Sequence, residues 1–409
     1  MFRIIVVLMA VLTAHLGACA QTGVAAESRL PKAPPGQADP AFQAWLAAFR
    51  VEALSQGVSA RTFDGAMRGV VPDVQVVTAN NNQPEFVRPV WDYLSSAISD
   101  TRVVNGRNML SQHRATLARL EETYGVDRHV LVAIWGLESG YGAFMGTHRV
   151  TQALATLAYS GRRTAFGREQ LLAALKILER GDIPADQMTG SWAGAMGHTQ
   201  FIPTTFNAFA VDADGDGKRD IWHSIPDALG SAGNYLGQSG WEKGGSWGQE
   251  VKLPDGFNYA LADMSLSKAH SDWAALGVKG IKGEALNEGR STLLLPAGYK
   301  GPAFLVQQNF RTVLRYNNAT SYSLAVNLLA DELRGRRGVV AAWPEDEQPL
   351  NAAARQEMQR LLTEKGYDTK GVDGIIGANT RDALRAWQVS VGLPADGYPT
   401  SGVLARLRR

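Results

Sequence analysis

A glutamate at the end of an apolar helix is the first residue whose setting suggests catalysis. In HVLVAIWGLESGYG, residues 129–142, the apolar Val130, Ile134 and Leu137 recur at helical spacing. Glu138 falls in the last turn, where apolar neighbours and the helix dipole both disfavour a charged carboxylate. A carboxyl that stays protonated near neutral pH is what a general acid for glycosidic cleavage requires. The alternative is a glutamate that merely faces solvent.

Two later segments carry uncharged polar groups of the kind that bind sugars. Residues 190–206, GSWAGAMGHTQFIPTTF, set Ser191 and Gln200 among small residues around a turn. Small residues let the backbone approach a ligand, and these two side chains offer hydrogen bonds. Residues 315–318, RYNN, followed by Tyr322, add an amide and aromatic faces. Each segment alone is a weak signal.

An acidic loop indicates a hard cation. DADGDGKRD, residues 212–220, has acidic residues at positions 1, 3, 5 and 9 and glycine at position 6, as an EF-hand loop begins. Position 12 is His223, a poor Ca²⁺ ligand, and Asp227 is placed to close the shell from further along. The alternative is a polar turn without metal. The expected ligands are Asp212, Asp214, Asp216, the Lys218 carbonyl and Asp227.

These motifs need a mostly helical body to position them. Periodic apolar stretches between residues 42 and 335 predict helices, with short β-type runs near 240–300. Asp127 is placed to cap the helix that carries Glu138. The charged, Pro-bearing segment 336–349 predicts a hinge before a compact domain at 350–409. The fold class expected is mainly α with a minor β part.

The N-terminus has the features of an export signal. Arg3 precedes an apolar run that is too short to span a bilayer, and the run ends Leu16-Gly17-Ala18-Cys19, which resembles a bacterial lipobox. We therefore expect a signal peptide over residues 1–19, lipidation of Cys19 and a tether over residues 20–41. Ordinary signal cleavage is the alternative. Because Ala20 is not aspartate, sorting by analogy favours the outer membrane and a periplasmic location.

Composition excludes several classes of protein. The 409 residues carry 41 Lys+Arg against 39 Asp+Glu, a formal charge of +2 that gives no reason to expect nucleic acid as a partner. A single cysteine excludes internal disulfides and thiolate metal sites, and the seven histidines lack zinc-ligand spacing. We expect a monomer with no organic cofactor.

In this order, the motifs resemble the lytic murein transglycosylase B family. Its marks are an apolar helix ending E-(S/T)-x-(Y/W)-G, then GS(Y/W)AGAMGxxQF(I/M)P, and RYN. The resemblance covers residues 42–335 and implies a lysozyme-like fold, a calcium loop at the acidic segment, and Glu138 as catalytic acid and base. It implies that the glycan is held by Ser191, Gln200, Asn317 and Tyr322, and that Arg162 and Arg163 lie near the groove. The alternative for the arginine pair is a solvated basic turn.

The C-terminal domain resembles the small three-helix peptidoglycan-binding domain. VDGIIGANTRDALRAWQVSVGLPADG follows that family's VDGxxGxxT…A…FQ…GL…DG pattern, with Trp387 where phenylalanine is usual. Leu362 and Leu384 mark two amphipathic helices on either side of the VDG turn. A generic helical cap is the alternative.

The first resemblance implies cleavage without water. Ordinary glycosidases use two carboxyl groups, and only Glu138 lies in an active-site motif. The expected reaction cuts the bond between N-acetylmuramic acid and N-acetylglucosamine and leaves a 1,6-anhydro ring. The rivals are a lysozyme-like hydrolase and a non-catalytic wall-binding lipoprotein.

Overall fold

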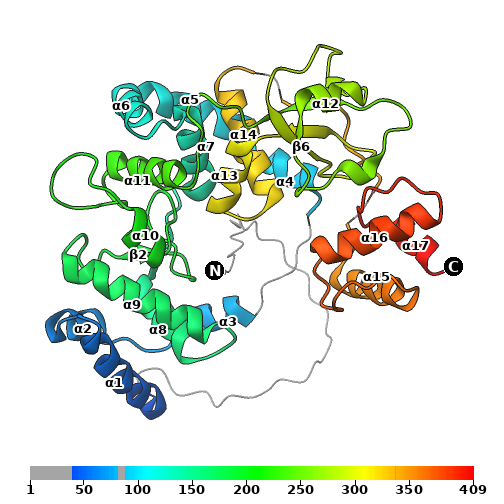
Figure 1. The fold of residues 1–409 in the computed structure, drawn as a ribbon. Coiled ribbons are helices and arrows are strands. Elements are labelled where there is room, and N and C mark those ends of the chain that lie inside the picture. Colours follow the sequence, from blue (N-terminus) through cyan, green and yellow to red (C-terminus); the bar gives the residue numbers. More distant parts are fainter. Residues whose placement is uncertain (1–38, 82–87, 337, 348) are drawn as a thin grey trace. The chain divides into compact units, whose positions relative to one another are not determined.

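The structure is a computed structural model that describes residues 39–81, 88–336, 338–347 and 349–409. The predicted signal peptide, Cys19 and nearly all of the tether lie outside the described residues. The described chain divides into two compact units. Figure 1 shows their helices and strands in chain order.

The first unit is helical and contains the described residues up to 81 together with 146–196 and 201–208. Its elements are α1 (Pro40–Ser55), α2 (Ala60–Ala66), α3 (Val74–Asn81), β1 (His148–Arg149), α8 (Val150–Tyr159), α9 (Thr164–Arg180), β2 (Thr189–Gly190) and, ending one residue beyond the unit, α10 (Pro203–Phe209). Gly167 lets α8 and α9 pack closely, because a Cβ there would lie 2.4 Å from the Ala158 nitrogen.

The second unit contains the helix that carries Glu138. The helices of this part are α4 (Val90–Ala97), α5 (Asp100–Gln112), α6 (Arg114–Tyr124), α7 (Arg128–Ser139), α11 (Ile225–Gln238), α13 (Gln308–Tyr316) and α14 (Thr320–Leu333). Glu138 lies on α7, which packs against α5, α6, α11 and α14. Six consecutive residues of α7, 130–135, are at most 2% exposed, so α7 is a core helix.

A small antiparallel sheet also belongs to the second unit. The elements of this part are β3 (Gly248–Lys252), η1 (Tyr259–Leu261), β4 (Lys268–Ala269), α12 (His270–Ala275), β5 (Lys279–Gly280), β6 (Arg290–Leu294) and β7 (Ala303–Val306). The strands lie in the order β4-β6-β7-β3-β5. One face packs on α13 and α14 through Phe304, Phe310 and Leu324, and a second apolar cluster surrounds Trp273. The strands expected near 240–300 are therefore present.

Three short helices close the chain: α15 (Ala352–Glu364), α16 (Ala378–Ser390) and α17 (Ser401–Leu407). They enclose one apolar cluster, in which Leu362 and Leu384 are fully buried and Trp387 is 4% exposed. The mainly α fold expected from the sequence is confirmed. Among the described residues, no helix has the length and apolarity needed to cross a membrane.

Candidate active site

Helix α7 is fixed at both ends, and its last turn carries Glu138. Asp127 caps the helix, because its Oδ1 accepts a hydrogen bond of 2.8 Å from the His129 backbone nitrogen. Gly140 ends the helix in the left-handed conformation, with φ of 58°, where glycine carries no steric cost. Asp127 also pairs with Arg334 at 2.7 Å, which ties the start of α7 to the end of α14.

Glu138 is set among protein atoms but keeps some access to solvent. The hydroxyl of Tyr322 donates a 2.5 Å hydrogen bond to its Oε1, and Tyr322 itself is only 5% exposed. The pKa of Glu138 is raised to about 7. Burial causes the rise, and the Tyr322 hydrogen bond opposes it in part by stabilising the carboxylate. At neutral pH this carboxyl can therefore both give and take a proton.

Three tyrosines lie near enough to the carboxyl to be affected by its charge, and the sequence indicated Tyr316 and Tyr322 but not Tyr93. The pKa values of Tyr93, Tyr316 and Tyr322 are all raised by burial first and then by the charge of Glu138, that of Tyr93 to about 12. All three hydroxyls therefore stay protonated and available as donors. Tyr316 donates to the Thr199 carbonyl at 2.7 Å. Tyr316 lies in the quoted RYNN motif, whereas no motif drew attention to Tyr93.

A histidine network braces the chain just after Glu138. Trp135 Nε1 donates to His198 Nδ1 at 3.0 Å, and Ser139 Oγ donates to the His198 carbonyl at 2.7 Å. Gly142 is required here, because its φ is +88° and a Cβ would lie 2.3 Å from the His198 ring. Burial lowers the pKa of His198, which favours the neutral ring that accepts from Trp135. His198 thus has a packing role.

Gln200 and Asn317 both belong to the unit that holds Glu138. Gln200 has a positive φ of 52°, and its Nε2 donates to the carbonyls of Met145 (3.1 Å) and Gly197 (2.9 Å). The amide nitrogen of Gln200 thus braces its own loop, which the sequence did not indicate. The buried Oδ1 of Asn317 has no hydrogen-bond partner among the described residues, so it can accept from a ligand.

The other three predicted glycan contacts lie in the first unit. Ser191 Oγ accepts hydrogen bonds from the backbone nitrogens of Ala193 (3.3 Å) and Ala195 (3.0 Å), so it shapes the turn. Arg162 donates to the Asn80 carbonyl at 3.4 Å. The guanidinium of Arg163 lies over the Trp192 ring at 5.7 Å. The arginine pair is therefore held by local contacts rather than being wholly solvated.

The acidic loop forms a cluster of four carboxylates. Ligand oxygens of Asp212, Asp214, Asp216 and Asp227 all lie within 4.8 Å of one another. Asp227, on α11, is fully buried, whereas the other three are exposed. The ring of His223, at loop position 12, contacts Asp220 instead (3.0 Å). An all-oxygen donor set of this charge fits Ca²⁺. Lys218 lies in the loop, and its backbone nitrogen donates to Asp216 at 2.8 Å.

Comparison with known proteins gives a consistent result over most of the chain. The transglycosylase SLT domain matches residues 41–331, and a peptidoglycan binding domain matches residues 351–407. Membrane-bound lytic murein transglycosylase B of Escherichia coli (strain K12) is 33% identical over 285 residues, which are 67% of this chain and 74% of that protein.

Solved structures are similar over a larger share of the chain. SltB3 from Pseudomonas aeruginosa in complex with NAG-anhNAM-pentapeptide is 54% identical, with a TM-score of 0.88 over 91% of this chain and all of that chain. The Escherichia coli lytic transglycosylase Slt35 in complex with calcium is 29% identical, with a TM-score of 0.59 over 72% of this chain and 93% of that chain.

Proposed function

The chain belongs to the transglycosylase SLT family, and from this premise we propose that Glu138 is the catalytic acid and base of a lytic murein transglycosylase. The enzyme acts on peptidoglycan and carries a C-terminal peptidoglycan-binding domain. The observation that carries the proposal is the enclosed Glu138 carboxyl, with a pKa of about 7 and Tyr322 on its Oε1. A proton donor near neutral pH is what cleavage of a glycosidic bond needs.

In the first step Glu138 gives its proton to the oxygen that links N-acetylmuramic acid to N-acetylglucosamine. The bond from muramic C1 to that oxygen breaks, and the substrate's 2-acetamido group stabilises the positive C1. This replaces the second carboxylate of ordinary glycosidases. Burial and Tyr322 account for the pKa of Glu138, with no contribution from another carboxyl among the described residues.

In the second step the Glu138 carboxylate takes the proton of the muramic C6 hydroxyl. The C6 oxygen attacks C1, which closes the 1,6-anhydro ring and returns the proton to Glu138. The Tyr322 hydroxyl, 2.5 Å from Oε1, stabilises the carboxylate between the two steps. No water enters the product, so the enzyme is a lyase.

The glycan is held by hydrogen bonds to uncharged groups. The unpartnered Oδ1 of Asn317 accepts from a sugar hydroxyl or the N-acetyl nitrogen. Tyr322 contacts the reacting sugar, and Gln200 contributes its Oε1, since its nitrogen is engaged. We assign Ser191 to shaping the glycan-binding turn, and Arg162 and Arg163 to binding the anionic parts of the polymer.

The rate should fall above pH 7, because the acid must hold its proton. Below its pKa of about 7 Glu138 is protonated, and above it the rate drops about tenfold per pH unit. Tyr322→Phe removes a hydrogen bond that favours the carboxylate, so the pKa of Glu138 rises and this limb moves to higher pH. Tyr93→Phe, which leaves that bond intact, should not move it. Initial rates measured between pH 5 and 9 test this prediction. If the rate of Tyr322→Phe falls at the same pH as that of the wild type, the assignment of this fall to Glu138 is contradicted.

The acidic loop binds one structural Ca²⁺ through Asp212, Asp214, Asp216 and Asp227, with the Lys218 carbonyl as a further oxygen ligand. The ion would offset half of the formal charge of the four clustered carboxylates and brace the start of α11. A chelator should therefore lower the midpoint of thermal unfolding. At a Ca²⁺ concentration 100 times its Kd, binding stabilises the fold by about 2.7 kcal/mol.

Readdition of Ca²⁺ should restore the midpoint, and Asp214→Asn should reduce the response. An identical midpoint with chelator and with excess Ca²⁺ would show that the loop is a metal-free turn.

Cys19 and the C-terminal domain are proposed to hold the enzyme at the cell wall. Cys19, which lies outside the described residues, is proposed to carry the lipid that anchors a monomeric enzyme to the outer membrane, facing the periplasm. The related Escherichia coli enzyme is named membrane-bound. Residues 350–409 keep the enzyme on peptidoglycan strands, since residues 351–407 match the binding domain.

A zymogram on purified murein tests the activity. Clearing by the wild-type chain shows cleavage, and its absence would favour the non-catalytic wall-binding lipoprotein. The lysozyme-like hydrolase also clears murein, so the two enzymes are separated by their products.

A further inference from the structure

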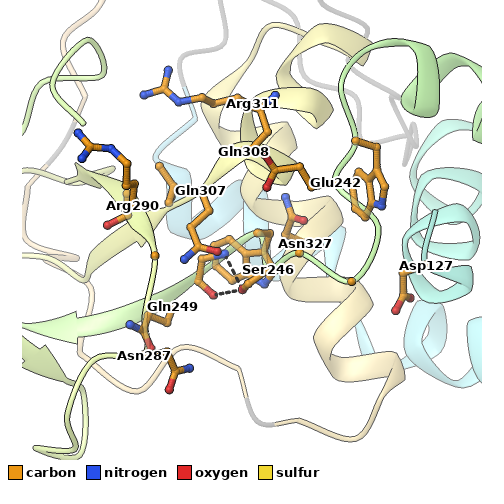
Figure 2. A pocket seen from close by; sticks show the side chains of 18 of the residues that line it. Asp127, Glu242, Ser246, Gln249, Asn287, Arg290, Gln307, Gln308, Arg311 and Asn327 are labelled. Atoms are coloured by element: carbon orange, nitrogen blue, oxygen red, sulfur yellow. Dashed lines mark hydrogen bonds between the residues drawn. The ribbon is translucent and has the colours of Figure 1, made fainter. Parts of the chain in front are cut away.

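A cavity lies at the other end of the helix that carries Glu138. It has a volume of about 1190 Å³ and is lined by Asp127, which caps α7, by Val130 of α7, by strands of the sheet and by the start of α13 (Figure 2). Glu138 is eleven residues beyond Asp127 along the chain, about 16 Å along the helix axis. None of the three tyrosines around Glu138 lines this cavity. It is therefore a separate site, which the mechanism does not use.

Three polar side chains that line the cavity have atoms without a hydrogen-bond partner. These atoms are Ser291 Oγ, Asn327 Oδ1 and Gln249 Nε2, and within the described part of the chain nothing pairs with them. Ser291 is 2% exposed and Asn327 is fully buried. Buried polar groups are almost always hydrogen-bonded, because leaving one unpaired costs free energy. A polar ligand in the cavity would satisfy them.

One side of the cavity carries positive charge. Arg290 donates to the Ser267 carbonyl at 2.8 Å, and Arg311 donates to the Met264 carbonyl at 2.5 Å and to Thr292 Oγ1 at 2.6 Å. Neither arginine is paired with a carboxylate among the described residues. Both hold the same segment, 264–267, and Figure 2 shows their guanidinium groups on the same side of the pocket.

The first turn of α13 adds to this positive field. Gln307 precedes the nine-residue helix, and no side chain caps the helix N-terminus. Gln307, Gln308 and Arg311 all line the cavity. Helix N-termini attract anions through their free N–H groups and the helix dipole.

None of the four acidic residues in the described lining of the cavity forms an ion pair with Arg290 or Arg311. Asp127 is paired with Arg334 and Glu121 with Arg128. Glu242 and Glu288 line the cavity as exposed side chains, and neither is paired with Arg290 or Arg311. The guanidinium groups of Arg290 and Arg311, which within the described chain bind only uncharged oxygens, therefore keep their charge for an anion.

The remaining lining groups fit a peptide better than a sugar. Side-chain amides of Gln249, Asn287, Gln307 and Gln308 line the cavity, and an amide can both donate and accept, as a peptide group does (Figure 2). The Gln308 nitrogen already donates to the Gly240 carbonyl at 3.1 Å and the Gln307 nitrogen contacts His270 Nε2 at 3.4 Å, so these two residues offer mainly their oxygens. Trp247 offers little aromatic face for sugar stacking, because it is 8% exposed and its Nε1 donates to Asp331 at 2.9 Å.

We propose that this cavity binds an acidic peptide, with its carboxylate on Arg290 and Arg311 and its backbone on the amide side chains. Given the function proposed above, the peptide is a stem peptide of the murein polymer. The site would then hold peptidoglycan through its peptide, independently of the glycan at Glu138.

Calorimetry with the full chain and a free murein stem pentapeptide tests the proposal. The same peptide with all its carboxylates amidated should bind at least tenfold more weakly, and so should the unmodified peptide to Arg290→Gln, because a charge-assisted contact is lost. Gln249→Ala should weaken binding several-fold. Arg107→Gln is the matched control. Arg107 is also exposed and donates to a backbone carbonyl (Glu332, 2.7 Å), but it lies outside the cavity. This variant should bind the pentapeptide as the wild type does.

The result is independent of catalysis, because Glu138→Gln should bind the peptide as the wild type does even where turnover is lost. The proposal is overturned if the pentapeptide does not bind, if the amidated peptide binds equally well, or if Arg290→Gln binds normally. Binding of a peptide-free disaccharide that Arg290→Gln abolishes would likewise overturn it, by showing a sugar site.

Discussion

Glu138→Gln should lower the rate of glycan cleavage by about 10³-fold, because one side chain serves as acid in the first step and base in the second. Glutamine keeps the shape of the side chain and can still accept from Tyr322, which lies 2.5 Å from Oε1. The lower rate would therefore reflect the missing proton donor rather than a change in the shape of the site. Release of soluble muropeptides from purified murein measures the rate. A variant that retains a tenth of wild-type activity would remove Glu138 from the acid role.

Stability provides the control for this variant. The pKa of Glu138 is raised from 4.5 to about 7, so between these values the unfolded chain releases a proton that the folded chain keeps. The contribution of Glu138 to the free energy of unfolding is therefore greatest below pH 4.5 and is lost as the pH rises through 7. A glutamine side chain cannot ionise, so Glu138→Gln should be more stable than the wild type at pH 8 and nearly equal at pH 4. A less stable variant at pH 8 would indicate misfolding.

Asp227→Ala should lower the free energy of unfolding by about 3 kcal/mol, because it leaves three backbone N–H groups without their acceptor. The fully buried carboxylate accepts from the nitrogens of Ala213 (2.7 Å), Asp214 (3.2 Å) and Asp220 (2.9 Å). It therefore holds the acidic loop against α11 even without a cation. Chemical denaturation in the presence of chelator measures this effect alone.

Asp227→Asn is the matched variant, since its oxygen can still accept from Ala213 and Asp214. It should lose less stability in chelator than Asp227→Ala. Its unfolding midpoint should respond to added Ca²⁺ about as weakly as that of Asp227→Ala. If Asp227→Ala unfolds like the wild type in chelator, the buried carboxylate does not organise the loop.

The sequence predicted features that depend on local pattern. Asp127 and Gly140 bound a helix whose apolar spacing is plain, so Glu138 could be placed on it. The acidic loop and the terminal three-helix domain follow from short motifs in the same way. Asp227 could be included because it lies only seven residues beyond Asp220, and the structure brings it to the carboxylate cluster.

Other features depend on contacts between distant segments. Tyr93 comes near Glu138 only through the packing of α4 against α14, which no spacing in the chain reveals. Gln200 has a positive φ and a side-chain nitrogen bound to its own loop, and its residue type predicts neither. The cavity at the start of α7 joins residues from 121 to 336, which share no motif that would group them.

Mass spectrometry of the soluble fragments released from purified murein tests the central claim most directly. If Glu138 donates a proton to the glycosidic oxygen and then takes one from the C6 hydroxyl, as proposed, the muramic ends form 1,6-anhydro rings. These ends are lighter by one water than hydrolysed ends. Borohydride should leave them unchanged, because they have no reducing group. Reducible muramic ends carrying the added water would contradict the account and show that the enzyme is a hydrolase.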